Sequence, residues 1–175
     1  GRDTDGLAVF GDLACGDSSA MKLPAGQRLS VEGHVDIAAL KKRGVTVDTL
    51  IRHWMFVTEY VWTRLHPAPE GKSLTVMDME GVKMSDVAGD AMEFIKKCTK
   101  LIQDHYPERA AGVFVVNVPT WFSWVWALVR PMINPRTRAK MHIYAKKSVY
   151  LPKLLQRVDA AVLPRCYGGA AALAT

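Results

Sequence analysis

The sequence predicts a single α/β domain built around a largely parallel sheet, and three observations support this class. Segments with the two-residue hydrophobic period of strands alternate along the chain with segments that have the 3.6-residue period of helices. The length of 175 residues suits one domain with a substantial core. The composition, 49% hydrophobic and 23% charged, is typical of globular proteins and excludes disorder, collagen and coiled coil for the chain as a whole.

The N-terminal part of the chain is predicted to hold one strand and one short helix. The apolar residues of 7–13 predict the first strand, and a polar, glycine-containing connection is expected to run from it to about Gly33. Asp36 is a suitable N-cap for a short helix over 37–43, which Gly44 can end.

A longer helix and a strand follow. Asp48 is expected to cap the helix and Pro67 to end it. Its apolar residues recur at helical spacing: Leu50, Ile51, Trp54, Val57, Val61 and Leu65. Residues 73–79 predict a strand whose alternation places Ser73, Thr75, Met77 and Met79 on one face and Leu74, Val76 and Asp78 on the other.

Residues 111–129 form a stretch of 19 residues without charge, which by length alone is a candidate membrane span. Before it, Ser85 is expected to cap a third amphipathic helix, which must end before Pro107. The β-branched residues of 112–118 predict instead a buried strand that Pro119 ends, followed by a short helix over 120–130. A strand in open lipid would leave its backbone unpaired, so we place this stretch inside a folded domain.

The C-terminal part is predicted to be a series of short elements. Asn134 and Pro135 together are a strong helix start. A short strand over 141–145 and a short helix over 151–157 follow, and Gly168-Gly169 closes the domain.

The charge distribution points to an anionic partner for the C-terminal part. Residues 1–108 hold 13 basic and 16 acidic residues, whereas residues 109–175 hold 10 basic residues and 1 acidic residue. A nucleic acid, an anionic membrane or a phosphorylated ligand would each suit this asymmetry, and so would a merely solvated basic face. Within this part, Thr137 and Lys140 are three residues apart after the helix start at Asn134, a combination that can hold a phosphate or belong to a solvated helix.

Aromatic residues cover all sides of the helix predicted over 120–130. Such a helix is either completely buried or faces lipid. Three tryptophans within six residues, followed by a basic segment, favour contact with a membrane interface over burial in the core. The residues concerned are Trp121, Phe122, Trp124, Trp126, Leu128 and Val129.

Enzymatic chemistry finds little support in the sequence. The five histidines stand at no metal-ligand spacing, and no P-loop, GxGxxG or GxSxG motif occurs. Three widely spaced cysteines form neither a disulfide framework nor a zinc pattern, so a reducing compartment fits best. Cys98, seven residues before His105, is expected in the core, and Asp78 with Glu80 in a turn or hydrogen bond rather than in acid–base work. We therefore expect no catalytic residue, no metal and no cofactor.

Several motifs, in order along nearly the whole chain, resemble the CRAL-TRIO lipid-binding domain. Its opening G-x-D-x-x-G-R-P-V is similar to residues 1–10, although Leu7-Ala8 stands where Arg-Pro is common. Residues 78–81 resemble its D-x-x-G strand end. Residues 106–109 and 117–119 resemble its Y-P-E-R and N-x-P motifs, and 163–169 resemble its closing segment. The nearest relatives look like the yeast-type phosphatidylinositol/phosphatidylcholine transfer proteins, and only the region 17–46 matches poorly.

The resemblance implies a mixed sheet that floors an apolar lipid pocket, covered by helices that include a mobile gate helix over 120–133. It implies that a phosphoinositol headgroup is held by Glu108, Thr137 and Lys140, and a phosphatidylcholine headgroup by Ser73 and Thr75. It also implies one domain over 1–175, without the N-terminal helical segment of the family.

From these points we expect non-catalytic binding of phospholipid and its exchange between membranes, with phosphatidylinositol favoured and phosphatidylcholine second. The partners expected are a phospholipid ligand and, transiently, anionic membranes. No nucleic acid is expected. The protein is expected to be a cytoplasmic, peripheral-membrane monomer. The alternatives are a carrier of another hydrophobic ligand, of the retinoid, tocopherol or squalene type, and a regulatory protein-interaction domain.

Overall fold

A four-stranded sheet forms the centre of the computed structural model, which describes residues 27–32, 37–65, 67, 71–161 and 163–170. The strand order is β1-β2-β3-β4, and each neighbouring pair is parallel. The strands are β1 (Gln27–Glu32), β2 (Lys72–Asp78), β3 (Ala110–Val116) and β4 (Met141–Ile143). The α/β class is therefore confirmed, and the strands described here form a parallel sheet rather than the mixed sheet that the resemblance implied.

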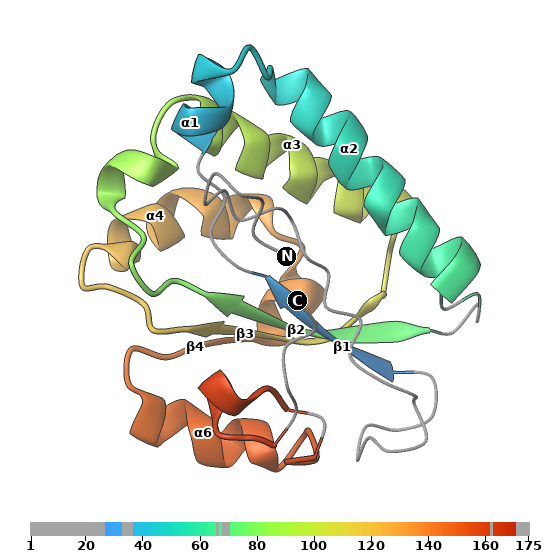
Figure 1. Ribbon diagram of the computed structural model, residues 1–175, viewed down its shortest axis with the longest axis vertical. Coiled ribbons are helices and arrows are strands. Elements are labelled where there is room, and N and C mark those ends of the chain that lie inside the picture. Colours follow the sequence, from blue (N-terminus) through green and yellow to red (C-terminus); the bar gives the residue numbers. More distant parts are fainter. Residues whose placement is uncertain (1–26, 33–36, 66, 68–70, 162, 171–175) are drawn as a thin grey trace.

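Helices lie on both faces of this sheet, as parallel strands require. Figure 1 shows α2, α3 and α4 over one face and α6 over the opposite face. The longer helices are α2 (Val47–Tyr60), α3 (Asp90–His105), α4 (Phe122–Val129) and α6 (Lys147–Leu155). The shorter ones are α1 (Ile37–Lys42), η2 (Val61–Leu65, a π-helix that continues α2), η3 (Met84–Val87), η4 (Arg130–Met132), α5 (Pro135–Ala139) and η5 (Arg165–Tyr167).

Strand β1 corrects the prediction of a polar connection up to about Gly33. In its register with β2, Leu29 pairs with Leu74 and Val31 pairs with Val76. Because the segment is short and mostly polar, the sequence signal is weak, and its pairing with the buried strand β2 stabilises it. The strand predicted over 7–13 lies outside the described residues.

Two helix starts also differ from the predictions. The N-cap of α2 is Thr46, whose hydroxyl oxygen accepts the Thr49 N–H at 3.2 Å, while Asp48 lies in the first turn and pairs with Lys97 of α3 at 2.7 Å. Ser85 does not cap α3 but lies in the 3₁₀ turn η3, where its hydroxyl donates to Asp86. Helix α3 begins only after Gly89, whose φ of 56° breaks the helical path.

Helix α6 begins four residues before the predicted start at Leu151, and Pro152 lies inside it. Proline is favoured in the first turn of a helix, which is why the sequence predicts a later start. The earlier start places Tyr150 and Leu154, four residues apart, on one fully buried face. Burial of that face therefore outweighs the hydrogen bond that Pro152 cannot donate.

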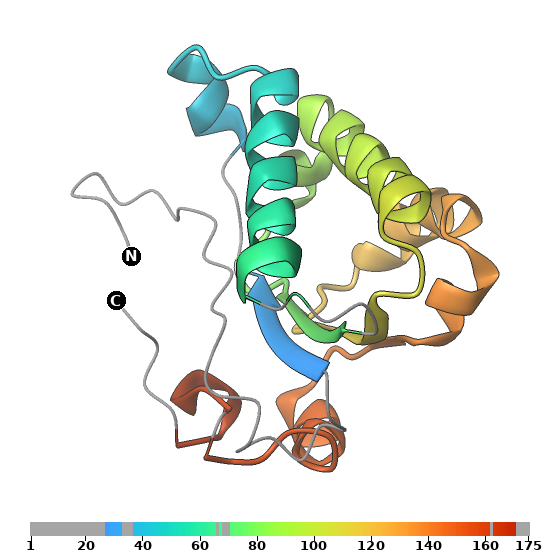
Figure 2. The same ribbon diagram turned by 90° about the vertical axis from the view of Figure 1, so that its right-hand side faces the viewer.

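Among the described residues, the core consists of two separate hydrophobic clusters. The larger joins the α6 face of the sheet to α6 and η5, and its members are Leu74, Val76, Phe114, Val116, Tyr150, Leu154, Val158, Leu163 and Tyr167. The smaller lies between the helices of the other layer and is formed by Leu50, Ile51 and Phe94, with partly buried neighbours that include Trp54, Cys98 and Leu101. Figure 2 shows α2 and α3 side by side in this layer. The prediction that Cys98 lies in the core agrees with this packing.

The two faces of the sheet differ in how completely they are covered. On the α6 face, Leu74 and Val76 are 0% exposed. On the face toward α2, α3 and α4, Val115 is buried, but other apolar residues of that face remain only half-buried: Met77 and Ile143, which pair with Val115, and Val113 and Met141, which pair with each other. The described helices therefore leave part of an apolar sheet face incompletely covered.

Candidate functional site

Glu108 and Lys140 form the centre of a charged cluster at the amino ends of β3 and β4. The Lys140 ammonium lies 3.1 Å from Glu108 Oε2 and also donates to the Ala110 carbonyl at 2.9 Å. Arg136 Nη1 lies 3.5 Å from Glu108 Oε1. Two of the three residues that the resemblance implied for a phosphoinositol headgroup are thus brought together, and Arg136 joins them.

Counted over the residues that the structure describes, the cluster has one carboxylate for two cations, which is a net positive charge. The hydrogen bond and charge of Lys140, followed by those of Arg136, lower the pKa of Glu108 below its usual 4.5. Glu108 is 52% exposed, so water screens these pairs and each adds little to stability. A site of this kind can exchange its internal ion pairs for contacts to an anionic ligand.

Thr137 and Lys140 lie close together at the carboxyl end of α5. The Lys140 backbone N–H donates to the Thr137 carbonyl at 3.0 Å, and both side chains are half-buried. The predicted helix start is confirmed, since Asn134 Oδ1 accepts the Arg136 N–H at 2.9 Å. However, α5 has only five residues, so any anion here would be held by side chains rather than by a helix dipole.

Ser73 and Thr75 lie on β2, on the incompletely covered face of the sheet. Both are half-buried and alternate with the fully buried Leu74 and Val76, as predicted. Ser73 stands opposite Ala110, whose carbonyl accepts the Lys140 ammonium. The structure thus brings both predicted headgroup sets to the same end of the sheet.

The segment around Glu108 is held from both sides. The Tyr106 hydroxyl donates a hydrogen bond to Glu59 of α2. Burial is the larger cause, and this hydrogen bond the next, that raises the pKa of Tyr106 to about 12. Arg109 donates to the Gly71 carbonyl at 2.9 Å and lies 4.5 Å from the centre of the Trp62 ring in η2. Between them Glu108 adopts a φ of 62°, an uncommon conformation for a residue other than glycine.

Helix α4 is not completely buried, so the first of the two alternatives that its composition suggested is wrong, while contact with lipid stays a prediction. Trp124 and Leu128, four residues apart, are 72% and 65% exposed and form one outer stripe. Val125 is buried, and Trp121, Phe122, Trp126 and Val129 are half-buried. The helix thus presents apolar side chains both to the molecule and to solvent.

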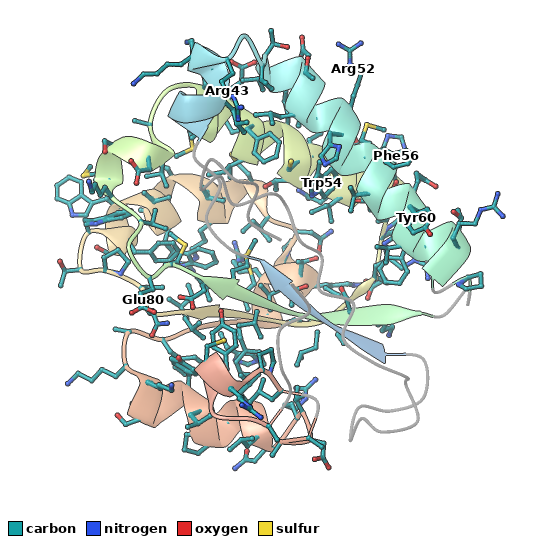
Figure 3. All side chains as sticks on the ribbon, viewed as in Figure 1. Arg43, Arg52, Trp54, Phe56, Tyr60 and Glu80 are labelled. Atoms are coloured by element: carbon teal, nitrogen blue, oxygen red, sulfur yellow. The ribbon has the colours of Figure 1, made fainter. Side chains whose placement is uncertain are left out.

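A second polar cluster, which the sequence predictions missed, lies at the carboxyl ends of β2 and β3. Asp78 Oδ1 accepts the Glu80 N–H at 2.9 Å and the Asn117 amide at 2.8 Å, and Asp78 Oδ2 accepts the Tyr167 hydroxyl at 2.8 Å. Figure 3 labels Glu80 at this end of the sheet. The expectation that Asp78 and Glu80 form a turn is confirmed, whereas the contacts to Asn117 and Tyr167 have no local sequence signal.

Two other kinds of site are absent from the described part of the chain. No group of three or more His, Cys, Asp or Glu residues there could hold a metal ion. Among the same residues, no helix is long and apolar enough to cross a membrane. The charge-free stretch that suggested a span forms β3 and α4 instead.

A parallel sheet with helices on both faces defines an α/β domain, and the charged cluster at its amino ends is a candidate site for an anionic ligand. Comparison with known proteins identifies the family. The model of the CRAL/TRIO domain matches residues 33–169. The chain therefore belongs to the CRAL/TRIO family, whose members are typically non-catalytic lipid-binding proteins.

Curated relatives match a shorter part of the chain. The phosphatidylinositol/phosphatidylcholine transfer protein SFH7 of Arabidopsis thaliana is 34% identical over 98 residues, which are 56% of this chain and 18% of that protein. The SEC14 cytosolic factor of Yarrowia lipolytica is 36% identical over 97 residues, 55% of this chain and 19% of that protein. These matches thus span less than a fifth of each relative.

The crystal structure of Sfh5 resembles most of this fold. It has a TM-score of 0.62 and 21% sequence identity, and the match covers 81% of this chain and 52% of that one. At this level of identity the likeness establishes the fold alone.

Proposed function

We propose that this chain binds a phospholipid and exchanges it at membrane surfaces without chemical change, with phosphatidylinositol favoured and phosphatidylcholine as second ligand. The single observation that carries the proposal is the incompletely covered apolar face of the sheet, which ends at the Glu108–Lys140 cluster. A hydrocarbon chain on that face, with its headgroup at the cluster, would satisfy both features.

The acyl chains of a phospholipid require an apolar surface. Two chains carry about 30 methylenes, and at about 0.8 kcal/mol each their exposure to water costs roughly 24 kcal/mol. A carrier must therefore cover them with apolar surface. Half-buried side chains such as Met77, Val113 and Ile143 supply such surface, and they lie under the helix layer that contains the separate Leu50–Phe94 cluster.

The headgroup of a phospholipid requires polar and charged partners. Lys140 and Arg136 can donate hydrogen bonds to a phosphate, and Glu108 can accept hydrogen bonds from inositol hydroxyls. Ser73 and Thr75, at the same end of the sheet, offer hydroxyl groups to a phosphatidylcholine phosphate. The names of the Arabidopsis relatives, phosphatidylinositol/phosphatidylcholine transfer proteins, support this ligand class.

Helix α4 is the element that we assign to membrane contact and gating. Its exposed Trp124 and Leu128 suit the interface of a bilayer, while Val125 on the other side packs into the molecule. The basic C-terminal part would attract an anionic leaflet at about 1 kcal/mol per nearby charge.

Lipid extraction tests the proposal directly. The purified protein is examined by native mass spectrometry, and its lipid is extracted and identified. We expect phosphatidylinositol to co-purify with the unaltered protein and to be lost from Lys140→Ala. The control is Lys146→Ala, which removes an exposed lysine before α6 and should leave the lipid in place. Unchanged phosphatidylinositol in Lys140→Ala would remove the headgroup assignment.

The same experiment separates the two alternative functions. A ligand without a headgroup would leave buried charges of the site unpaired, which disfavours a carrier of such ligands. In the structure, however, Glu108 and Lys140 pair with each other and Glu108 is half-exposed, so this cost is reduced. Extraction of a retinoid-, tocopherol- or squalene-like molecule would support that carrier, and recovery of no lipid would support a protein-interaction domain.

A further inference from the structure

The Asp78 carboxylate connects three segments that are distant in the sequence. It accepts hydrogen bonds from the Glu80 N–H after β2, from the Asn117 amide after β3 and from the Tyr167 hydroxyl in η5. A carboxylate with three donors around it is well satisfied, so the network costs little to bury and holds its members in fixed positions.

Asn117 is the residue at which the chain leaves β3 for α4. Its φ of 54° turns the chain into the left-handed region, which asparagine tolerates better than other residues except glycine. Such a conformation persists where the surrounding structure holds it. Here the holding contact is the hydrogen bond that its side-chain amide donates to Asp78, at 2.8 Å.

Helix α4 depends on its two ends for its position. Of its eight residues only Val125 is buried. After the helix, Ile133 is buried and the Gln103 amide donates to the Met132 carbonyl at 2.8 Å. Before it, the Asn117 network and the Val118 N–H bond to the Tyr144 carbonyl, at 3.2 Å, anchor the chain.

Tyr167 is held rigidly in this network. It is buried, and burial, followed by its bond to Asp78, raises the pKa of Tyr167 well above its usual value, so its hydroxyl stays a donor. The next residue, Gly168, has a φ of 81°, and a Cβ there would meet Leu151 of α6 at 2.9 Å. The turn η5 is thus packed closely against α6 and aims Tyr167 at Asp78.

We propose that Tyr167 is a positioning residue that acts through Asp78 and Asn117 to fix the segment leading from β3 into α4, and that its hydroxyl thereby slows the movement of α4 away from the sheet. The effect on ligand exchange rests on the function proposed above. The effect on α4 itself does not, because it follows from the hydrogen bonds alone. A phenylalanine at this position would fill the same space and leave the Asp78 carboxylate with one donor fewer.

Amide hydrogen exchange on the full chain, without added lipid, tests the effect on α4. We expect Tyr167→Phe and Asp78→Asn each to raise exchange in peptides from 118–133 by about tenfold, the size of effect given by loss of one hydrogen bond to a charged group. The control is Val158→Ala, which removes methyl groups from the same buried cluster outside the network and lowers global stability. An increase in 118–133 no larger than in the control would overturn the proposal.

Transfer of a fluorescent phosphatidylinositol between vesicles tests the consequence. We expect Tyr167→Phe to transfer faster than the unaltered protein while the equilibrium amount of bound lipid stays the same, a split that a merely destabilised core does not produce. Slower transfer, or equal changes in rate and binding, would contradict the role in opening. Faster amide exchange with no lipid transfer by either protein would support the anchoring of α4 and reject the proposed function instead.

Discussion

The Lys140 ammonium lies 3.1 Å from the Glu108 carboxylate, although 32 residues separate them in the sequence. The parallel pairing of β3 with β4 explains the contact. Glu108 precedes β3 and Lys140 precedes β4, and parallel neighbours begin at the same edge of the sheet. The register therefore brings the two charges together and leaves Arg136 close enough to join them.

Glu108→Gln is expected to weaken phosphatidylinositol binding about tenfold, because it removes the acceptor charge while keeping the shape. Unfolding by urea should change little, since the ion pairs of Glu108 are exposed. Titration with vesicles that contain phosphatidylinositol measures the binding. Glu93→Gln, which breaks an exposed pair with Lys97, is the control, and an equal loss of binding in both variants would argue against a headgroup role.

Trp124→Ala is expected to weaken binding to anionic vesicles, because the side chain is 72% exposed on the outer stripe of α4. The matched control is Phe56→Ala on α2, an aromatic residue of similar exposure, 67%. Figure 3 labels Phe56 with Arg52 and Tyr60 along that helix. Vesicle flotation gives the bound fraction, and an equal decrease in both variants would indicate nonspecific aromatic adsorption.

The stability of the protein is expected to fall as the pH decreases below about 6.5, through His142. Burial, followed by the nearby Arg157 and Lys153 charges, lowers the pKa of His142 below 6.5. The unfolded chain then binds a proton that the folded chain resists, so stability is present above pH 6.5 and is lost as the pH falls toward the folded value. Urea unfolding at pH 7.5 and pH 5.5 measures this loss.

His142→Phe keeps an aromatic ring beside Phe114 and Tyr144, but this ring cannot be protonated. We expect the variant to lose less stability than the unaltered protein between the two pH values. The same loss in both proteins would mean that other groups cause the pH dependence.

Two substitutions on β2 test the difference between the faces of the sheet. Leu74→Ala, in the fully buried α6 face, should cost about 2–5 kcal/mol of unfolding free energy. Met77→Ala, on the half-buried face, should cost about 1 kcal/mol and reduce the amount of co-purified lipid. Chemical denaturation and lipid extraction measure the two effects. A Met77→Ala cost as large as that of Leu74→Ala would show that the protein itself fills the space above Met77.

Local sequence patterns predicted the elements whose signals are strong. The buried strands β2 and β3 lie within two residues of their predicted bounds, because each has a run of apolar residues that only a covered strand explains. The predicted start of α5 is also confirmed, because an asparagine cap followed by proline is a local signal. Strand β1 and the first turn of α6 were missed, because pairing with β2 and burial of Tyr150 stabilise them, and neither effect is local.

The same distinction applies to the candidate site. The sequence by itself determined the residue types, the basic C-terminal part, the alternation of Ser73 and Thr75 with buried neighbours, and the motifs of the family. Only the tertiary structure decided that Arg136 reaches Glu108, that Trp124 and Leu128 face outward, and that Tyr167 meets Asp78 across 89 positions. The physical reason is that hydrogen bonds and ion pairs depend on distances of a few ångströms, which strand register and helix packing set between segments that have no contact along the chain.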